Sequence, residues 1–296
     1  MTGLPVTRER LCCFGFLKLY EEPMNKLVVV LAAALACSSL MQTASAATRL
    51  PFRSDFENGT FSEWNGGPET TMSVTTQTAA SGRYSTQAIM RAGTPTDNYK
   101  DYVFGDHVVV GGTPVAASGL WVRFDSMFDT GFQFGTGSNL HKSVIINFED
   151  ENGRRRYQII LNVQNSNRQY FVEHLKWNAD RSFGGSIYGL GGQNIGTPVA
   201  VRLGQWDRIK LFIKPNTPGR SDGIVRMWVN GAMKFENTAV AVREDTSYNP
   251  NKVIMSNYVM DTSTAGTQRW DNFYVGETDP DANAVRPNAP VLNSVQ

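Results

Sequence analysis

The feature that most constrains the fold is a series of short runs rich in Val, Ile, Phe, Tyr and Trp, separated by turn-forming residues. Runs of this kind, bounded by Gly, Asn, Asp, Pro and Ser, are typical of strands in a sandwich. No segment carries a helical period that is capped at both ends. We therefore predict an all-β fold, an antiparallel β-sandwich. The predicted strands are 119–128, 142–149, 156–164, 169–177, 206–214, 224–231, 252–260 and 269–276.

The turns and ends of these runs define one domain. Asn152-Gly153 and Asn230-Gly231 predict tight type I′ hairpins, because both residues of such a turn need positive φ angles. The first run, near residues 50–64, and the last, 269–276, are predicted to be edge strands. We predict a single domain over 47–279. Residues 280–296 contain prolines and show no strand pattern, so we predict that they form a flexible tail.

The N-terminal part has the pattern of a secretory signal peptide. It begins at Met24, continues through an apolar run at 27–36 and ends at Ala44-Ser45-Ala46, so that the predicted signal peptide is 24–46. The apolar run, at about ten residues, is shorter than the roughly 20 residues that a spanning helix needs. We predict a secreted or periplasmic protein without a membrane span. Residues 1–23 are interpreted as an extension from a misassigned start codon.

Cysteine and charge exclude several classes of protein. The three cysteines, Cys12, Cys13 and Cys37, all precede the predicted cleavage point, so the domain has no thiol nucleophile, cysteine zinc site or iron–sulfur centre. Cys37 leaves one alternative open, a lipoprotein anchored at that residue. Removing residues 1–46 leaves 24 basic and 24 acidic residues, which argues against a broad nucleic-acid surface. We expect a monomer that binds no nucleic acid.

Strand periodicity predicts which side chains share a face. Alternate residues of a strand point to opposite sides. The apolar residues Val144, Ile146 and Phe148 of 142–149, and the odd positions of 156–164, would face the core. The predicted outward set combines the opposite positions of these strands with two residues of 169–177: His141, Asn147, Arg156, Gln158, Asn162, His174 and Lys176. Two interpretations remain open for this set. It lines a polar cleft, or it is a solvated outer face of an antiparallel sheet.

Other polar groups carry weaker signals. The acidic run 149–151 is predicted to be a hairpin tip, because a retaining glycosidase needs two carboxyl groups facing one sugar and these are consecutive. His107 is interpreted as structural. Asp55 and Asp271 would approach each other if the terminal strands pair, but they supply only two donors for Ca²⁺, which takes about six to eight oxygens. We therefore expect no cofactor, with a structural Ca²⁺ ion as the alternative.

Three segments carry a resemblance to a known family. They are DFENGTFSEW (55–64), GQWDRIKLFIKPNTPGRSDGIVRMWVNG (204–231) and RWDNFYVGE (269–277). They resemble the frame of concanavalin A-like jelly rolls, in particular secreted polysaccharide-lyase-like proteins related to alginate, glucuronan and heparin lyases. The resemblance covers most of 50–277 and implies a jelly-roll fold. It also implies that His141 and Lys142, in NLHKS, border the cleft and that Tyr258, in VIMSNY, lies on a late strand beside it.

The chain departs from the motifs of these lyases. It lacks the R-x-E-L-R strand, the Q-I-H triplet and the Y-F-K-x-G-x-Y-N-Q strand of the alginate-lyase pattern, and the Gly-Lys-Leu-Pro loop of the glucuronan-lyase type. The fold therefore carries over more firmly than the catalytic residues, since one fold hosts many functions.

Two functional hypotheses follow. The first is a polysaccharide lyase that cleaves a uronate-containing polymer by β-elimination, with His141 as the base, Tyr258 as the acid, and Lys142, Arg156 or oriented amides neutralising the uronate carboxylate. The second is a non-catalytic carbohydrate-binding domain, with Trp177 and Tyr188 of the glycine-rich loop 184–196 as aromatic platforms. A surface protein without a ligand is a third interpretation. The predicted substrate-binding set is Asn147, Arg156, Gln158, Asn162, His174, Lys176 and Trp177.

Overall fold

The computed structural model describes residues 50–67, 72–94, 98–105, 118–136, 140–150, 152–178, 183–187, 198–246, 248–259 and 261–282. The predicted signal peptide, the alternative anchor at Cys37, His107, Tyr188 and the tail after 282 lie outside these residues. Within them, every regular element is a strand. No helix of the described part is long and apolar enough to cross a membrane.

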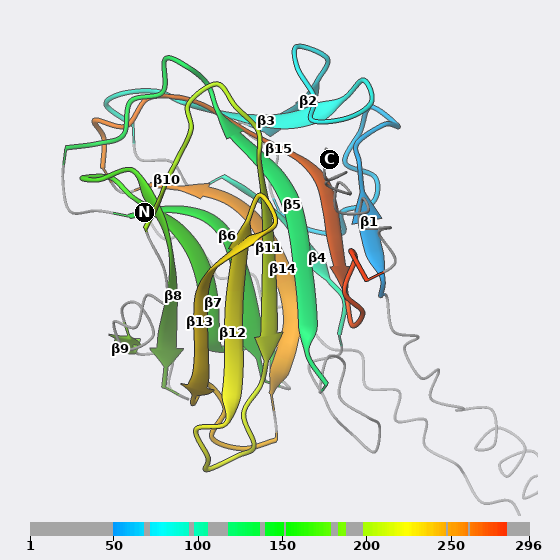
Figure 1. Cartoon of the computed structure of the whole chain (residues 1–296), viewed down its shortest axis with the longest axis vertical. Coiled ribbons are helices and arrows are strands. Elements are labelled where there is room, and N and C mark those ends of the chain that lie inside the picture. The colour runs from blue at the N-terminus through cyan, green and yellow to red at the C-terminus, as the bar shows by residue number, and fades with distance from the viewer. Residues whose placement is uncertain are drawn as a thin grey trace, which may run out of the picture. The chain divides into compact units, whose positions relative to one another are not determined.

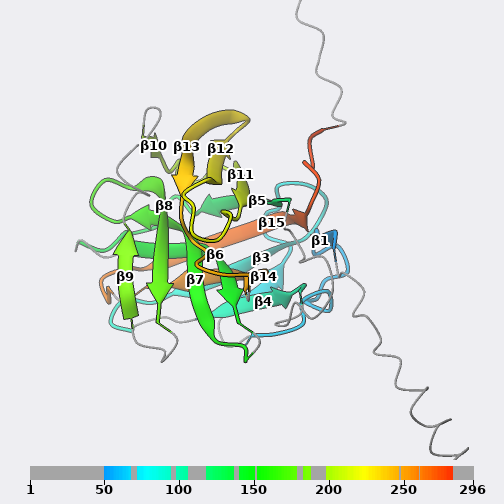
Figure 2. The same cartoon turned by 90° about the horizontal axis from the view of Figure 1, so that it is seen from below.

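The strands form two antiparallel sheets that pack face to face (Figures 1 and 2). The eight-stranded sheet has the order β13 (Ala232–Val240), β12 (Gly223–Val229), β11 (Asp207–Lys214), β5 (Leu120–Phe128), β15 (Gly266–Gly276), β3 (Ser85–Met90) and β2 (Met72–Thr75), with β1 (Phe52–Ser54) also paired to β15. The seven-stranded sheet has the order β10 (Val199–Ala200), β8 (Gln169–Trp177), β7 (Arg155–Gln164), β6 (Leu140–Glu149), β14 (Asn249–Tyr258) and β4 (Tyr99–Val103), with β9 (Phe183–Ile187) paired to β8. The predicted antiparallel sandwich is confirmed.

One hydrophobic core fills the space between the sheets. The even residues Val144, Ile146 and Phe148 of β6 and the odd residues of β7, such as Ile159 and Leu161, point into it, as their periodicity predicts. They meet alternate residues of β5, β11 and β12 from the other sheet. Because these strands bury one face in this core, the remaining face of the seven-stranded sheet is available for a site.

The two ends of the domain meet in the eight-stranded sheet. Phe52 of β1 lies opposite Val275 of β15, so the predicted approach of the terminal runs is confirmed. The prediction that 269–276 is an edge strand is wrong, because β15 lies between β5 on one side and β3 on the other. Its buried residues, Trp270 and Phe273 among them, belong to the core.

The two predicted type I′ turns have different outcomes. Asn230 and Gly231 have φ angles of +53° and +80°, which the predicted type I′ turn requires. In the β6–β7 turn, Gly153 has φ +67°, but its N–H donates to the Asp150 carbonyl oxygen at 2.8 Å. This turn therefore closes between Asp150 and Gly153, and the predicted type I′ turn centred on Asn152-Gly153 is wrong. The Asp150 carboxylate also accepts hydrogen bonds from the N–H groups of Asn152 and Arg154, both at 3.0 Å. Asp150 therefore stabilises the hairpin tip, whereas its neighbour Glu149 points elsewhere, as described below.

Candidate active site

A cleft of about 630 Å³ lies on the outer face of the seven-stranded sheet. Its floor is apolar: Ile145, Ile160 and Leu175 form a small cluster of their own, with Ile254 and Trp177 packed against it. The outward isoleucines of β6 and β7 thus pack against one another outside the main core. The lining residues are Tyr99, Asp101, Lys142, Ile145, Asn147, Glu149, Gly153, Arg154, Arg155, Gln158, Trp177, Lys252, Ile254, Ser256 and Tyr258.

A β-bulge decides which residues at the start of β6 enter the cleft. Lys142 lies opposite Asn162 of β7, but Val144 lies opposite the next residue, Leu161, so that β6 contains one extra residue here. A bulge of this kind breaks the alternation of side chains. As a result Lys142 points into the cleft, and both Ser143 and Val144 point towards the core.

His141 faces the core, so its predicted position on the open face is wrong. The side chain is fully buried, and the rings of Phe128, Phe132 and Phe134 surround the imidazole with centroid separations of 5.3 to 6.5 Å. Its Nε2 lies 2.5 Å from Oε1 of Gln268, a residue of the opposite sheet. Burial lowers the pKa of His141 to about 4, although the hydrogen bond to Gln268 acts in the other direction. A polymer in the cleft cannot contact this imidazole.

His174 and Lys176 also lie on the wrong side of their strand for the predicted role. His174 is opposite Ile159, a core residue, and packs edge-to-face against Tyr157. Lys176, in the same phase, extends to an ion pair with Glu244 at the border of the sheet. The cleft side of β8 is formed by the alternate residues instead, and Trp177 is the predicted residue that it does present to the cleft.

Arg156 is displaced from the cleft by a second irregularity. The β6–β7 register shifts between Phe148 and Glu149, and Glu149 pairs with Arg155. Arg155 therefore lines the cleft, with its guanidinium 4.6 Å from the ring centroid of Trp177. Arg156 lies 4.9 Å from the ring of Tyr248, away from the cleft-lining set. The prediction for Arg156 is wrong by one position.

Lys142 and Tyr258 form one end of the cleft. They lie opposite each other on β6 and β14, and the Lys142 ammonium is 4.7 Å from the centre of the Tyr258 ring. Both side chains are partly exposed to the cleft. This end therefore combines a cation with a phenol hydroxyl, the group types that bind a carboxylate and transfer a proton.

A chain of hydrogen bonds forms the other end. Gln158 Nε2 donates to Asn147 Oδ1, and Asn147 Nδ2 donates to Glu149 Oε1, both at 2.9 Å. Lys252 Nζ lies 2.9 Å from the same Glu149 oxygen and 3.8 Å from Asp101. These bonds fix both amides, and Gln158 Oε1 is buried without a partner in the described part of the chain. A buried acceptor of this kind favours a ligand that brings a donor.

The two ends are separate binding regions. The strand rise of about 3.3 Å per residue separates Lys142 from Asn147 by about 16 Å along β6. Asn147 and Gln158 are therefore too far from Tyr258 to act on the same sugar. Asn162, the remaining predicted residue, is buried and donates to Glu173 Oε2 at 2.9 Å on this outer face.

Several cleft residues were missed by sequence reasoning. Lys252, Ser256 and Tyr258 follow the strict two-residue period of β14, so the same alternation that gives Tyr258 could have found the other two. Arg154 and Arg155 directly follow the glycine of the β6–β7 turn, before the predicted strand 156–164 begins, so strand alternation did not assign them to a face. Tyr99 and Asp101 carried no usable signal, because β4 was not predicted as a strand. Glu149 was assigned to the hairpin tip, although strand alternation places it on the same face as Asn147.

Asp55 and Asp271, the two predicted donors for Ca²⁺, both accept hydrogen bonds within the protein. In the described residues, no three His, Cys, Asp or Glu side chains come together as a metal-binding group. Asp271 is buried and accepts hydrogen bonds from the backbone N–H groups of Ala80, Ser81 and Asn272. Asp55 accepts one from its near neighbour Glu57.

Comparisons with known proteins identify the family. A family model for polysaccharide lyases matches residues 56–255. The chain therefore belongs to the polysaccharide lyase family.

Solved structures agree on the fold. The endo-β-1,4-glucuronan lyase of the fungus Trichoderma reesei is similar, with a TM-score of 0.51 and 16% identity over 77% of this chain and 95% of that chain. The marine PL-14 alginate lyase of Aplysia kurodai has a TM-score of 0.50 and 13% identity, over 69% of this chain and 86% of that chain. A search of curated proteins finds no match. The predicted jelly-roll fold of lyase-like proteins is thus confirmed.

The buried histidines predict acid sensitivity. Burial lowers the pKa of both His141 and His174 from 6.5 to about 4. Between these values the unfolded chain binds more protons than the folded chain, so the free energy of unfolding falls as the pH falls from about 6.5 towards 4. Each histidine contributes up to about 3 kcal/mol across this window. Urea unfolding at a series of pH values measures the decline.

Asp271 and a His174 variant sharpen this test. Burial raises the pKa of Asp271 to about 6, so as the pH falls this carboxylate binds its proton in the folded chain before it does in the unfolded chain. Below pH 6 this proton binding therefore offsets the contribution of one histidine to the loss of stability.

His174→Leu is expected to reduce the fall in the free energy of unfolding towards acid pH, without loss of stability at neutral pH. The reason is that both ring nitrogens of His174 lack a partner in the described part of the chain. An unchanged pH profile in this variant would contradict the assignment.

Proposed function

We propose that this protein cleaves a uronate-containing polysaccharide by β-elimination in the cleft of the seven-stranded sheet. The observation that carries the proposal is the Lys142–Tyr258 pair on the open face, in a chain of the polysaccharide lyase family. The charge of the cleft agrees with an acidic polymer. The cations that line it are Lys142, Arg154, Arg155 and Lys252, against the carboxylates Asp101 and Glu149.

The reaction requires one proton to move. The C5–H bond of a uronate and its C4–O bond break, a C4=C5 double bond forms, and the leaving oxygen takes a proton. With His141 in the core, Tyr258 is the group we assign to both transfers. Its phenolate accepts the C5 proton, and the phenol that results donates a proton to the glycosidic oxygen. The enzyme is then returned to its starting state.

Lys142 is assigned to the carboxylate of the same sugar. Removal of the C5 proton places negative charge on that carboxylate, and a fixed cation stabilises the charge as it develops. The bulge supports this assignment, since it directs Lys142 towards the cleft beside Tyr258. The amides of Asn147 and Gln158, at the far end, are assigned to binding the continuing polymer.

Secretion is part of the proposal. The pattern over 24–46 supports export to the periplasm or the medium, where a polymeric substrate is accessible. Lipidation at Cys37 would instead hold the same domain at a membrane surface. Mass measurement of the protein recovered from its native host distinguishes cleavage after Ala46 from a lipidated Cys37.

The first test is the ultraviolet absorbance of the unsaturated uronate ends that elimination creates. The purified full chain is mixed separately with alginate, glucuronan, heparin and a neutral polysaccharide. Rising absorbance with at least one acidic polymer, and none with the neutral polymer, is the expected result. No rise with any polymer, together with retarded migration in gels containing one of them, would favour the alternative of a carbohydrate-binding domain. The Arg155–Trp177 stack suits that alternative as well.

Arg155→Ala is expected to raise KM about tenfold with little change in kcat. The Arg155 guanidinium packs on Trp177 towards the Asn147–Gln158 end of the cleft. In this proposal it binds polymer there but does not reach the reacting sugar at the Lys142–Tyr258 end. Arg156→Ala is the matched control, because its side chain packs on Tyr248 away from the cleft. A tenfold effect corresponds to about 1.4 kcal/mol of binding. Equal KM values for the two variants would show that Arg155 does not contact substrate.

A further inference from the structure

The outer face of the eight-stranded sheet carries a group of aromatic side chains. Trp121 of β5, Phe212 of β11 and Trp228 of β12 are partly exposed and adjoin one another, with centroid distances from Trp121 of 4.6 Å to Phe212 and 5.7 Å to Trp228. They alternate with residues that face the core, so this face is the one opposite the cleft. Adjoining, partly exposed aromatic rings on a surface mark a binding site more often than scattered ones do.

Cations are interleaved with these rings. Lys210 Nζ lies 5.1 Å from the centroids of both Trp121 and Trp228, and the Arg226 guanidinium lies 5.9 Å from Phe212. Arg123 is the register partner of Lys210 on β5. We call this set the aromatic–cationic surface; its members are Trp121, Arg123, Lys210, Phe212, Arg226 and Trp228.

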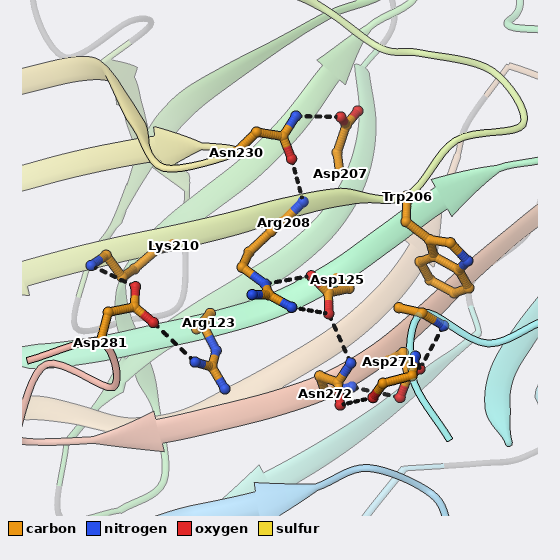
Figure 3. A network of polar contacts seen from close by, with 12 residues as sticks. Arg123, Asp125, Trp206, Asp207, Arg208, Lys210, Asn230, Asp271, Asn272 and Asp281 are labelled. Carbon is orange, nitrogen blue, oxygen red and sulfur yellow. Dashed lines mark hydrogen bonds and ion pairs between the residues drawn. The ribbon is translucent and has the colours of Figure 1, made fainter. Parts of the chain in front are cut away.

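Two carboxylates of the same chain already occupy the surface. After β15 the chain turns back, and Lys210 Nζ contacts Asp279 Oδ1 at 3.0 Å and Asp281 Oδ2 at 2.9 Å. Arg123 Nη1 contacts the other Asp281 oxygen at 3.0 Å, as Figure 3 shows for Lys210, Asp281 and Arg123. Burial raises the pKa of Asp281, but hydrogen bonds from Lys210 and Arg123 outweigh it and the net shift is downward. The surface thus binds carboxylates that are spaced along a chain.

The carboxylates in these contacts are the accessible partners. The Asp279 and Asp281 side chains are 29% and 38% exposed, whereas the Lys210 side chain is 13% exposed, so a polymer would replace the aspartates. A polyuronate carries a carboxylate on each of many sugars, so several of its groups compete at once with two from the protein. Its sugar rings also have apolar faces, which the exposed indole rings would cover.

We propose that the aromatic–cationic surface is a second binding site for acidic polysaccharide, occupied by Asp279 and Asp281 when no polymer is bound. The inference rests on the proposed function for the choice of polymer. The enzyme would then bind polymer at two sites on opposite faces of the sandwich. The aromatic–cationic surface would hold one part of the polymer while another part is cleaved in the cleft.

The test measures polymer binding by affinity electrophoresis of the full chain, with Tyr258→Phe as the background so that the polymer stays intact. Asp279→Asn with Asp281→Asn releases Lys210 and Arg123, and we expect it to tighten binding of the acidic polymer by about tenfold, or 1.4 kcal/mol. Trp228→Ala is expected to weaken binding by a similar factor. Neither change is expected to alter binding of a neutral polysaccharide.

Other outcomes overturn the inference. Unchanged affinity in the double aspartate variant would show that Asp279 and Asp281 only hold the C-terminal segment on the sheet. This variant changes two partly exposed side chains, so its result does not depend on whether Trp228→Ala folds. Equal gains for neutral and acidic polymers would exclude carboxylate recognition. Elimination on oligosaccharides long enough to reach both ends of the cleft but too short to reach the opposite face, measured without the Tyr258 change, reports the cleft alone. Its absence would refute the proposed function, whereas its retention in both surface variants separates the two sites.

Discussion

Tyr258→Phe is expected to reduce the rate of elimination by about 10²–10⁴-fold, the range that one positioned proton-transfer group contributes. The change removes only the hydroxyl, so the ring keeps its contact with Lys142 and the apolar floor of the cleft stays intact. KM is expected to change little, because the ring still occupies its place. Initial rates of ultraviolet absorbance on the best polymer, compared with binding in affinity gels, separate kcat from affinity.

Tyr99→Phe is the matched control for this experiment. Tyr99, on β4, lines the same cleft, and Tyr99→Phe also removes only a phenol hydroxyl, but Tyr99 is not paired with Lys142. A rate within a few-fold of the unmodified protein is expected for it. A Tyr258→Phe enzyme with full activity, or an equal loss in Tyr99→Phe, would remove Tyr258 from the mechanism.

His141→Ala is expected to lower the free energy of unfolding by about 3 kcal/mol and to leave the activity of each folded molecule unchanged. The substitution opens a cavity among Phe128, Phe132 and Phe134 and leaves Gln268 Oε1 without its contact. Gln268 also donates to Ser126 and Ser143, so the polar group between the sheets is disturbed as a whole.

Lys142→Ala, at the adjacent position, is expected to have the opposite profile. It removes a partly exposed cation from the cleft and leaves the core untouched, so stability changes little while elimination is lost. Urea unfolding and rates on the same preparations give both quantities. If His141→Ala abolished elimination in fully folded protein, the core position assigned to His141 would be contradicted.

Much of the fold was predictable, because the strands are long and their burial is regular. The predicted runs correspond to β5, β6, β7, β8, β11, β12, β14 and β15, and 169–177 matches β8 at both ends. Strands such as β3, β4 and β13 were missed. β4 (Tyr99–Val103), for example, has only one buried residue, the charged Lys100, and Asp101 follows it, so β4 lacks the apolar run that identifies its neighbours.

The site was predicted less well, for a reason that lies in individual residues. Strand alternation correctly directed Asn147, Gln158 and Asn162 outward. It failed for His141 and Arg156, because each lies beside a register shift that no local sequence signal marks. On β8 the phase itself was misjudged, so that His174 and Lys176 were predicted on the outer face of the sheet, where Glu173 and Leu175 lie. A single inserted residue in a strand therefore changes which side chains face the cleft and which face the core, while the fold stays the same.

The length of β6 has a consequence for the products of cleavage. Bond breaking is assigned to one end of the cleft, at Lys142 and Tyr258. The amides of Asn147 and Gln158, which are assigned to polymer binding, lie about 16 Å away along the strands. Polysaccharide chains have a direction, and these two ends are chemically different, so the polymer is expected to lie in one orientation only. Fragments released from the Asn147–Gln158 end would then share a minimum size, set by the distance between the two ends of the cleft. Cleavage would slow sharply once the remaining polysaccharide is too short to reach both ends.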